Sequence, residues 1–99
     1  MPYVFNTVER HPLGSQAFIP LAPFRFLVVV ASAGESVERE DLRAFVTNGN
    51  QGVSYGRNVW HMPLVALEPG QSFLVVDRLG EHDNCEERVL DGPVRLYAA

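Results

Sequence analysis

The feature that most constrains the fold is an alternation of short apolar runs with turn residues. No segment keeps helical periodicity over three turns. The longest apolar run, Phe26 to Ala31, has the length of a strand and a continuous centre that is typical of burial on both faces. Strong turn signals lie at residues 48–50 and 68–70. Many short strands at regular spacing indicate a sandwich or a barrel, so we expect an all-β fold.

The expected strands lie between these turns, and a polar segment at residues 32–41 holds at most one turn of helix. Ninety-nine residues suffice for one domain with a modest core, so residues 1–99 are expected to form a single unit. The strands are expected at Ala17–Leu21, Phe24–Ala31, Arg43–Thr47, Val53–Tyr55, Val59–His61, Leu64–Leu67, Phe73–Arg78, Glu86–Leu90 and Val94–Tyr97.

Charge and composition argue against several classes of partner. The net charge is −4 and all 8 basic residues are arginines, so no basic stripe is available for nucleic acid. No apolar run approaches the roughly 20 residues of a membrane span, and no basic, apolar leader is present, so neither a membrane nor a secretion signal is expected. A single cysteine, Cys85, allows no internal disulfide and fits a reducing cytoplasm.

Polar residues able to do chemistry gather in two stretches, residues 9–16 and 56–61. Alternate residues of a strand face the same side, so Glu9 and His11 are expected to point into the barrel together. Gln16 is expected on the neighbouring strand or turn, and His61 on another strand, with both side chains directed towards Glu9 and His11. Imidazole, carboxylate and amide oxygen all bind divalent metals, and imidazole suits nickel or zinc. We therefore expect these four side chains to form a polar cluster inside an apolar barrel.

Both stretches resemble the ureidoglycolate lyase family. The segments ERHPLGSQAFIPL, LRAFVTNGNQGVSYGRNVWHMPL, FLVVDR and DNCEE occur in the family's order, between about Val8 and Glu87. The resemblance implies a cupin-like, jelly-roll β-barrel. It also implies a carbon–nitrogen lyase that splits ureidoglycolate into glyoxylate and urea during allantoin degradation.

The resemblance to cupins suggests roles for the polar cluster. Glu9-x-His11-x4-Gln16 has the spacing of the first cupin motif, and residues 56–61 have the spacing of the second, with His61 at the histidine position. The implied metal ligands are Glu9, His11 and His61, holding nickel or zinc, although a site without metal remains open. Glu9 and His61 are the candidate catalytic residues, each as a base or a ligand.

Three further residues are candidates for binding the small carboxylate substrate. Arg57 is the candidate clamp, because its planar fork binds a carboxylate bidentately, and the alternative is a solvated loop charge. Gln16 and Tyr55 are the other candidates, and Tyr55 fits the core equally well. Asn58 stands where the second cupin motif has glycine, which asparagine tolerates because it accepts a left-handed backbone.

Departures from the family pattern leave two alternatives open. Gly56 and Met62 stand where the family usually has histidines, which favours a weakened relative that binds a carboxylate as a sensor or accessory subunit. A cupin enzyme of another substrate class is the third hypothesis. Family members usually carry a longer N-terminal segment, so this chain is expected to be a short form. Strands that close the barrel would then be missing, and we expect a second copy to cover the exposed edge of the sheet in a homodimer. Residues 77–78 are expected to serve as an ion pair or interface, and His82 to be exposed.

Overall fold

The computed structural model describes residues 3–62, 65–78, 80 and 84–97 of the chain. Apart from one 3-10 turn, η1, every regular element in these residues is a strand, which confirms the all-β expectation. The elements are β1 (Tyr3–Arg10), β2 (Gln16–Pro20), β3 (Phe26–Ala31), η1 (Arg39–Asp41), β4 (Arg43–Val46), β5 (Val53–Tyr55), β6 (Trp60–His61), β7 (Val65–Ala66), β8 (Phe73–Val76) and β9 (Glu86–Leu96). No helix in the described part is long and apolar enough to cross a membrane.

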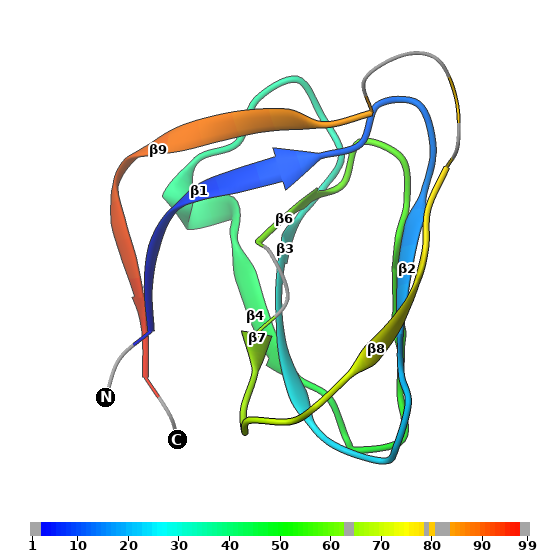
Figure 1. The fold of residues 1–99 in the computed structure, drawn as a ribbon. Helices are drawn as coiled ribbons and strands as arrows, with labels where there is room; N and C mark the ends of the chain where they lie inside the picture. The colour runs from blue at the N-terminus through cyan, green and yellow to red at the C-terminus, as the bar shows by residue number, and fades with distance from the viewer. Residues whose placement is uncertain (1–2, 63–64, 79, 81–83, 98–99) are drawn as a thin grey trace.

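The strands form two antiparallel sheets (Figure 1). The larger has the order β4-β3-β6-β1-β9, with β7 also paired to β3, and the smaller has the order β5-β2-β8. This arrangement is consistent with the cupin-like fold. The expected barrel is not closed, however, because no strand pairing joins the two sheets within the described residues.

Two strand assignments differ from the sequence-based expectation. β1 begins at Tyr3, ahead of any expected strand; its aromatic and β-branched residues favour an extended backbone, and it pairs with β9. β9 is one strand where two were expected. Its register against β1 shifts between Phe5 and Thr7, and this irregularity accommodates the additional residues 90–93 of β9. Leu64 and His82, which were also part of the expectations, lie outside the described residues.

The core consists of two apolar clusters on either side of the short strand β6. One contains Val8, Ala31, Val37, Trp60 and Leu90. The other contains Phe26, Val28 and Tyr55, with partly buried neighbours that include Phe18 and Phe73. Edge-to-face contacts between Phe26 of one sheet and Phe73 of the other, with ring centroids 5.0 Å apart, join the sheets. Trp60 thus anchors β6 in the first cluster, and the next residue, His61, faces the second.

Candidate functional site

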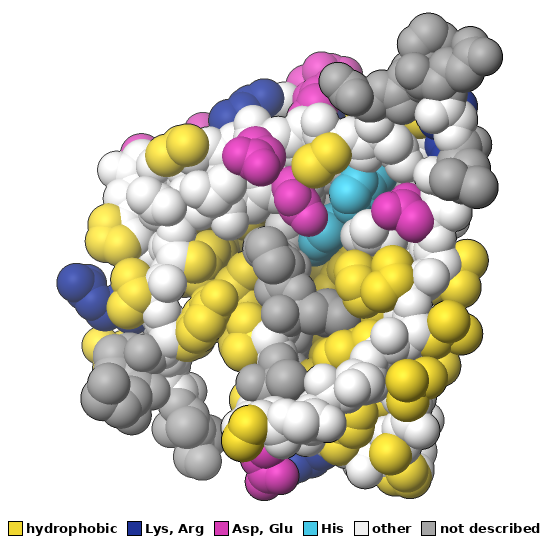
Figure 2. Space-filling view, viewed as in Figure 1, with side chains coloured by type: hydrophobic (Ala, Val, Ile, Leu, Met, Phe, Trp, Pro, Cys, Tyr) yellow, Lys and Arg dark blue, Asp and Glu magenta, His cyan; other side chains and the backbone are white. Residues whose placement is uncertain are grey.

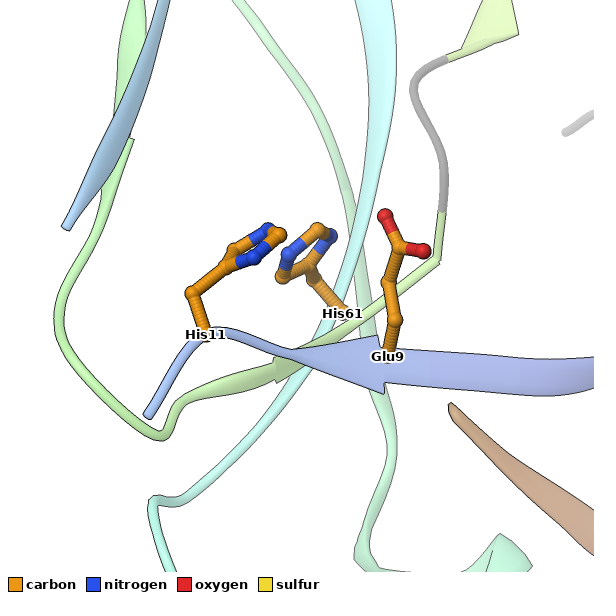
Figure 3. A group of neighbouring side chains, drawn as sticks. All are labelled: Glu9, His11 and His61. Carbon is orange, nitrogen blue, oxygen red and sulfur yellow. The ribbon is translucent and has the colours of Figure 1, made fainter. Parts of the chain in front are cut away.

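Glu9, His11 and His61 converge at the end of β1 (Figure 3). One possible ligand atom from each residue lies within 4.8 Å of the others. Glu9 lies opposite His61 in the antiparallel pair β1–β6, and His11 follows the last residue of β1. Both imidazoles are buried and Glu9 is half-buried. In the space-filling view, the histidine side chains are visible only between acidic and apolar neighbours (Figure 2).

His61 has one ring nitrogen free for chemistry. Its Nδ1 lies 3.3 Å from the carbonyl of Met62, and its buried Nε2 has no partner within the described residues. Burial lowers the pKa of His61, and the nearby carboxylate of Glu9 only partly opposes this effect. A neutral ring that donates Nδ1–H to the Met62 carbonyl leaves a lone pair on Nε2. That nitrogen can therefore accept a proton or bind a metal.

Tyr55 lies flat against His61, with ring centroids 4.1 Å apart and ring planes inclined by 2°. Its hydroxyl is buried and has no partner within the described residues. Burial raises the pKa of this hydroxyl to about 12, so it stays protonated at neutral pH. Tyr55 thus belongs to the core, where its ring packs against His61 and its hydroxyl is an unused hydrogen-bond donor.

His11 begins a hydrogen-bonded chain that crosses to the second sheet. Its Nδ1 contacts the carbonyl of Asn84, and its Nε2 lies 2.9 Å from Gln16 Oε1. The amide nitrogen of Gln16 in turn donates to Asp77 Oδ2 at 2.8 Å. Sequence reasoning missed Asp77, which was expected to pair with Arg78. Its only signal was an acidic residue directly after the apolar run of β8.

Cys85 contacts Glu9 from the start of β9. Its thiol lies 3.4 Å from Glu9 Oε2 and acts as the donor. Partial burial, and then the charge of Glu9, raise the pKa of this thiol to about 11. The thiolate is therefore scarce at neutral pH, and Cys85 is unsuited to act as a nucleophile.

Arg57 is exposed in the turn between β5 and β6. Its guanidinium makes no hydrogen bond or ion pair with the described residues, so the structure does not tie it to the cluster. The same turn contains Asn58, whose φ of 66° is the left-handed conformation expected there.

The donor set fits a divalent metal. Two imidazoles and one carboxylate form a common ligand set for zinc and for other first-row metals. The free Nε2 of His61 and the carboxylate of Glu9 are directly available. His11 completes the set only when its Nε2 leaves the Gln16 oxygen. Glu9, His11 and His61 thus form a possible metal-binding triad in which one member is engaged elsewhere.

Comparisons with known proteins show the family of the chain. The family model described as ureidoglycolate lyase matches residues 1–97. The chain is 56% identical over 87 residues to a ureidoglycolate lyase of Pseudomonas syringae pv. syringae, covering 88% of this chain and 51% of that protein. It is 50% identical over 99 residues to one of Pseudomonas fluorescens, covering 100% of this chain and 59% of that protein. The chain therefore spans about half the length of the curated relatives it matches.

Proposed function

The chain belongs to the ureidoglycolate lyase family, and from this premise we propose that it cleaves ureidoglycolate into glyoxylate and urea. The observation that carries the proposal is the buried Nε2 of His61, which has no partner within the described residues and lies beside the carboxylate of Glu9. A carbon–nitrogen lyase needs a base for the substrate hydroxyl and an acid for the departing nitrogen. This pair of groups can serve both needs.

The reaction begins with the loss of a proton from the substrate. Ureidoglycolate carries a carboxylate, a hydroxyl and a urea nitrogen on one carbon. His61 Nε2 takes the hydroxyl proton while the carbon–nitrogen bond breaks and the carbonyl of glyoxylate forms. The resulting imidazolium returns that proton to the urea nitrogen. Glu9 stabilises the imidazolium, since its charge raises the pKa of His61.

A divalent metal, nickel or zinc, fits the same residues and would be held by Glu9, His11 and His61. Bound there, it would polarise the substrate carboxylate and hydroxyl and lower the pKa of the hydroxyl.

Substrate binding is assigned to groups around the triad. The hydroxyl of Tyr55 is a buried donor beside His61, and the half-buried Gln16 borders His11. Arg57 would reach the substrate carboxylate from the exposed turn, where a guanidinium can form two parallel hydrogen bonds with it.

We also propose a homodimer in the cytoplasm. β8 is the last strand of the smaller sheet in the described part and exposes Leu74, Val75 and Val76 by 50%, 49% and 53%. A second copy that covers this apolar edge strand would prevent unspecific pairing. The single cysteine suits a reducing compartment.

Urea release from racemic ureidoglycolate tests the proposal, with chelator and with added nickel or zinc. His61→Asn is expected to lower turnover by about 10² to 10⁴-fold, the usual contribution of a general base. Cys85→Ser is the matched control: Cys85 also contacts Glu9, and turnover is expected to be retained because Cys85 is given no role in the reaction. Glyoxylate binding without any turnover of ureidoglycolate would instead identify a sensor or accessory subunit.

A further inference from the structure

A cavity with mostly apolar walls lies between the paired ends of β1 and β9 and the strands β3, β4 and β7 (Figure 1). Its volume is about 550 Å³, within the roughly 300 to 1,000 Å³ of small-molecule sites. Leu27 of β3 lines it, whereas the next residue, Val28, packs in the second core cluster with Tyr55. Because side chains alternate along a strand, the cavity lies on the face of β3 opposite Tyr55 and His61. It is therefore separate from the candidate site.

The walls of this cavity carry aromatic rings that water partly reaches. Tyr3, Phe45 and Tyr97 line it together with aliphatic neighbours, and they remain 41%, 57% and 72% exposed. Exposed apolar side chains that gather in one hollow are typical of a surface that binds a partner or ligand. An occupant with an apolar body would remove these rings from water, which is favourable.

Arg25 supplies the only charge among the described residues that line the cavity. Its guanidinium makes no hydrogen bond or ion pair with the described residues. The chain has 12 acidic residues, but none of those that the structure describes lines this cavity. A guanidinium binds a carboxylate through two parallel hydrogen bonds. One arginine balances the single charge of a carboxylate, whereas a phosphate monoester carries about −1.5 to −2.

We propose that this cavity binds a small monocarboxylate with an apolar chain or ring. The carboxylate pairs with Arg25, and the apolar part contacts Tyr3, Phe45 and Tyr97. This site goes beyond the proposed cleavage of ureidoglycolate and does not depend on it, since the cavity and the triad share no residue. Ureidoglycolate and glyoxylate are polar throughout, so the apolar walls do not favour them.

Titration calorimetry of the full chain with octanoate, and with octan-1-ol as an uncharged analogue, tests the proposal. We expect one octanoate to bind per chain, about 10-fold more tightly than octan-1-ol, the lower end for hydrogen bonds to charged groups. Decanoate should bind more tightly than octanoate, by about fourfold for each added methylene. An absence of saturable binding would overturn the proposal. Equal affinities for the acid and the alcohol would also overturn it, because they describe an apolar face that a second copy or another apolar partner covers.

Two arginines provide a matched pair of variants. Arg25→Met is expected to lower the affinity for octanoate about 10-fold, to that of octan-1-ol, while octan-1-ol binds as before. Arg95→Met removes the same charge from a nearby strand and should leave both affinities unchanged. Arg95 lies opposite Val4 in the β1–β9 ladder, whereas the neighbouring pair of Tyr3 and Leu96 lines the cavity from the other face. Equal losses in the two variants would refute the assignment of the carboxylate to Arg25.

A bulky variant locates the site. Ala44 lines the cavity from the exposed edge strand β4, so Ala44→Trp should fill the cavity and abolish octanoate binding. His61→Asn should leave octanoate binding unchanged, because His61 lies on the other face of β3. Binding that survives Ala44→Trp, or that disappears in His61→Asn, would place the ligand elsewhere and overturn the proposal. Thermal denaturation checks that the variants are folded, and if Ala44→Trp is not, the comparison of Arg25→Met with Arg95→Met decides alone.

Discussion

Glu9 and Arg10 are consecutive residues of β1, and their side chains lie in contrasting environments on opposite sides of the strand. On one side, the guanidinium of the buried Arg10 donates to Glu86 at 2.8 and 3.0 Å and to the carbonyl of Gly34. It also stacks over Trp60, 5.0 Å from the ring centroid, and the indole N–H donates to the same Gly34 carbonyl. Every polar group of this side chain is thus engaged, and we call this set the Arg10 side.

On the opposite side, which we call the His61 side, buried polar groups lack partners. His61 Nε2 and the Tyr55 hydroxyl are both unpaired within the described residues. A buried polar group without a partner costs about 1 to 3 kcal/mol. The Arg10 side therefore holds the strands together, whereas the His61 side leaves hydrogen-bonding capacity unused within the described residues. The difference predicts that mutations on the two sides change different properties.

The largest effect on stability is expected for Trp60→Ala, which removes the most voluminous fully buried side chain of the Arg10 side. The free energy of unfolding should fall by about 3 to 5 kcal/mol, as for other buried aromatic residues cut to alanine. Urea denaturation followed by circular dichroism measures it. A loss below about 1 kcal/mol would show that this side does not hold the fold.

Arg10→Met is expected to lower the free energy of unfolding by about 1.5 to 3 kcal/mol, the range for hydrogen bonds to charged groups. The methionine keeps much of the contact with Trp60 but leaves Glu86 unpaired. Arg39→Met is a suitable control, because it breaks a solvent-exposed ion pair with Asp91 and should change stability by less than about 1 kcal/mol. Equal losses in the two variants would contradict the contrast between buried and exposed arginines.

The His61 side should respond to pH. The pKa of His61 is lowered below its usual 6.5, so the unfolded chain binds this proton more readily than the folded one. The contribution of His61 to stability is complete above pH 6.5 and is lost as pH falls towards its folded pKa. The slope is at most about 1.4 kcal/mol per pH unit. Denaturation of the metal-free chain between pH 7.5 and 5 should show this loss, and His61→Asn should lack it. Parallel pH profiles for the two chains would show that His61 is not desolvated.

Tyr55→Phe is expected to have the smallest effect, and of the opposite sign. It removes a buried hydroxyl that has no partner within the described residues while keeping the ring against His61. The free energy of unfolding should rise by about 1 kcal/mol, the lower end of the cost of such a group. Thermal denaturation compares the two chains. A loss of stability would mean that the hydroxyl already has a partner.

Short-range patterns in the sequence were sufficient to predict part of this structure. Apolar runs and turn residues predicted the all-β fold, because strands and turns depend on neighbouring residues. The alternation of side chains along a strand placed Glu9 and His11 on the same side, as the structure shows. The backbone of Asn58 followed from its residue type in the same way. Each of these features depends on residues that lie a few positions apart in the chain, so the sequence alone predicts it.

Tertiary pairing decided the rest. Residues 3–10 are rich in residue types that favour a strand, but only the tertiary structure decides that β1 pairs with β9, near the other end of the chain. Asp77 meets Gln16 across 61 residues, only because β2 and β8 pair in one register. The free nitrogen of His61 likewise depends on what lies around it after folding. Such contacts depend on which distant strands meet and in which register, and short-range patterns in a sequence do not record that choice.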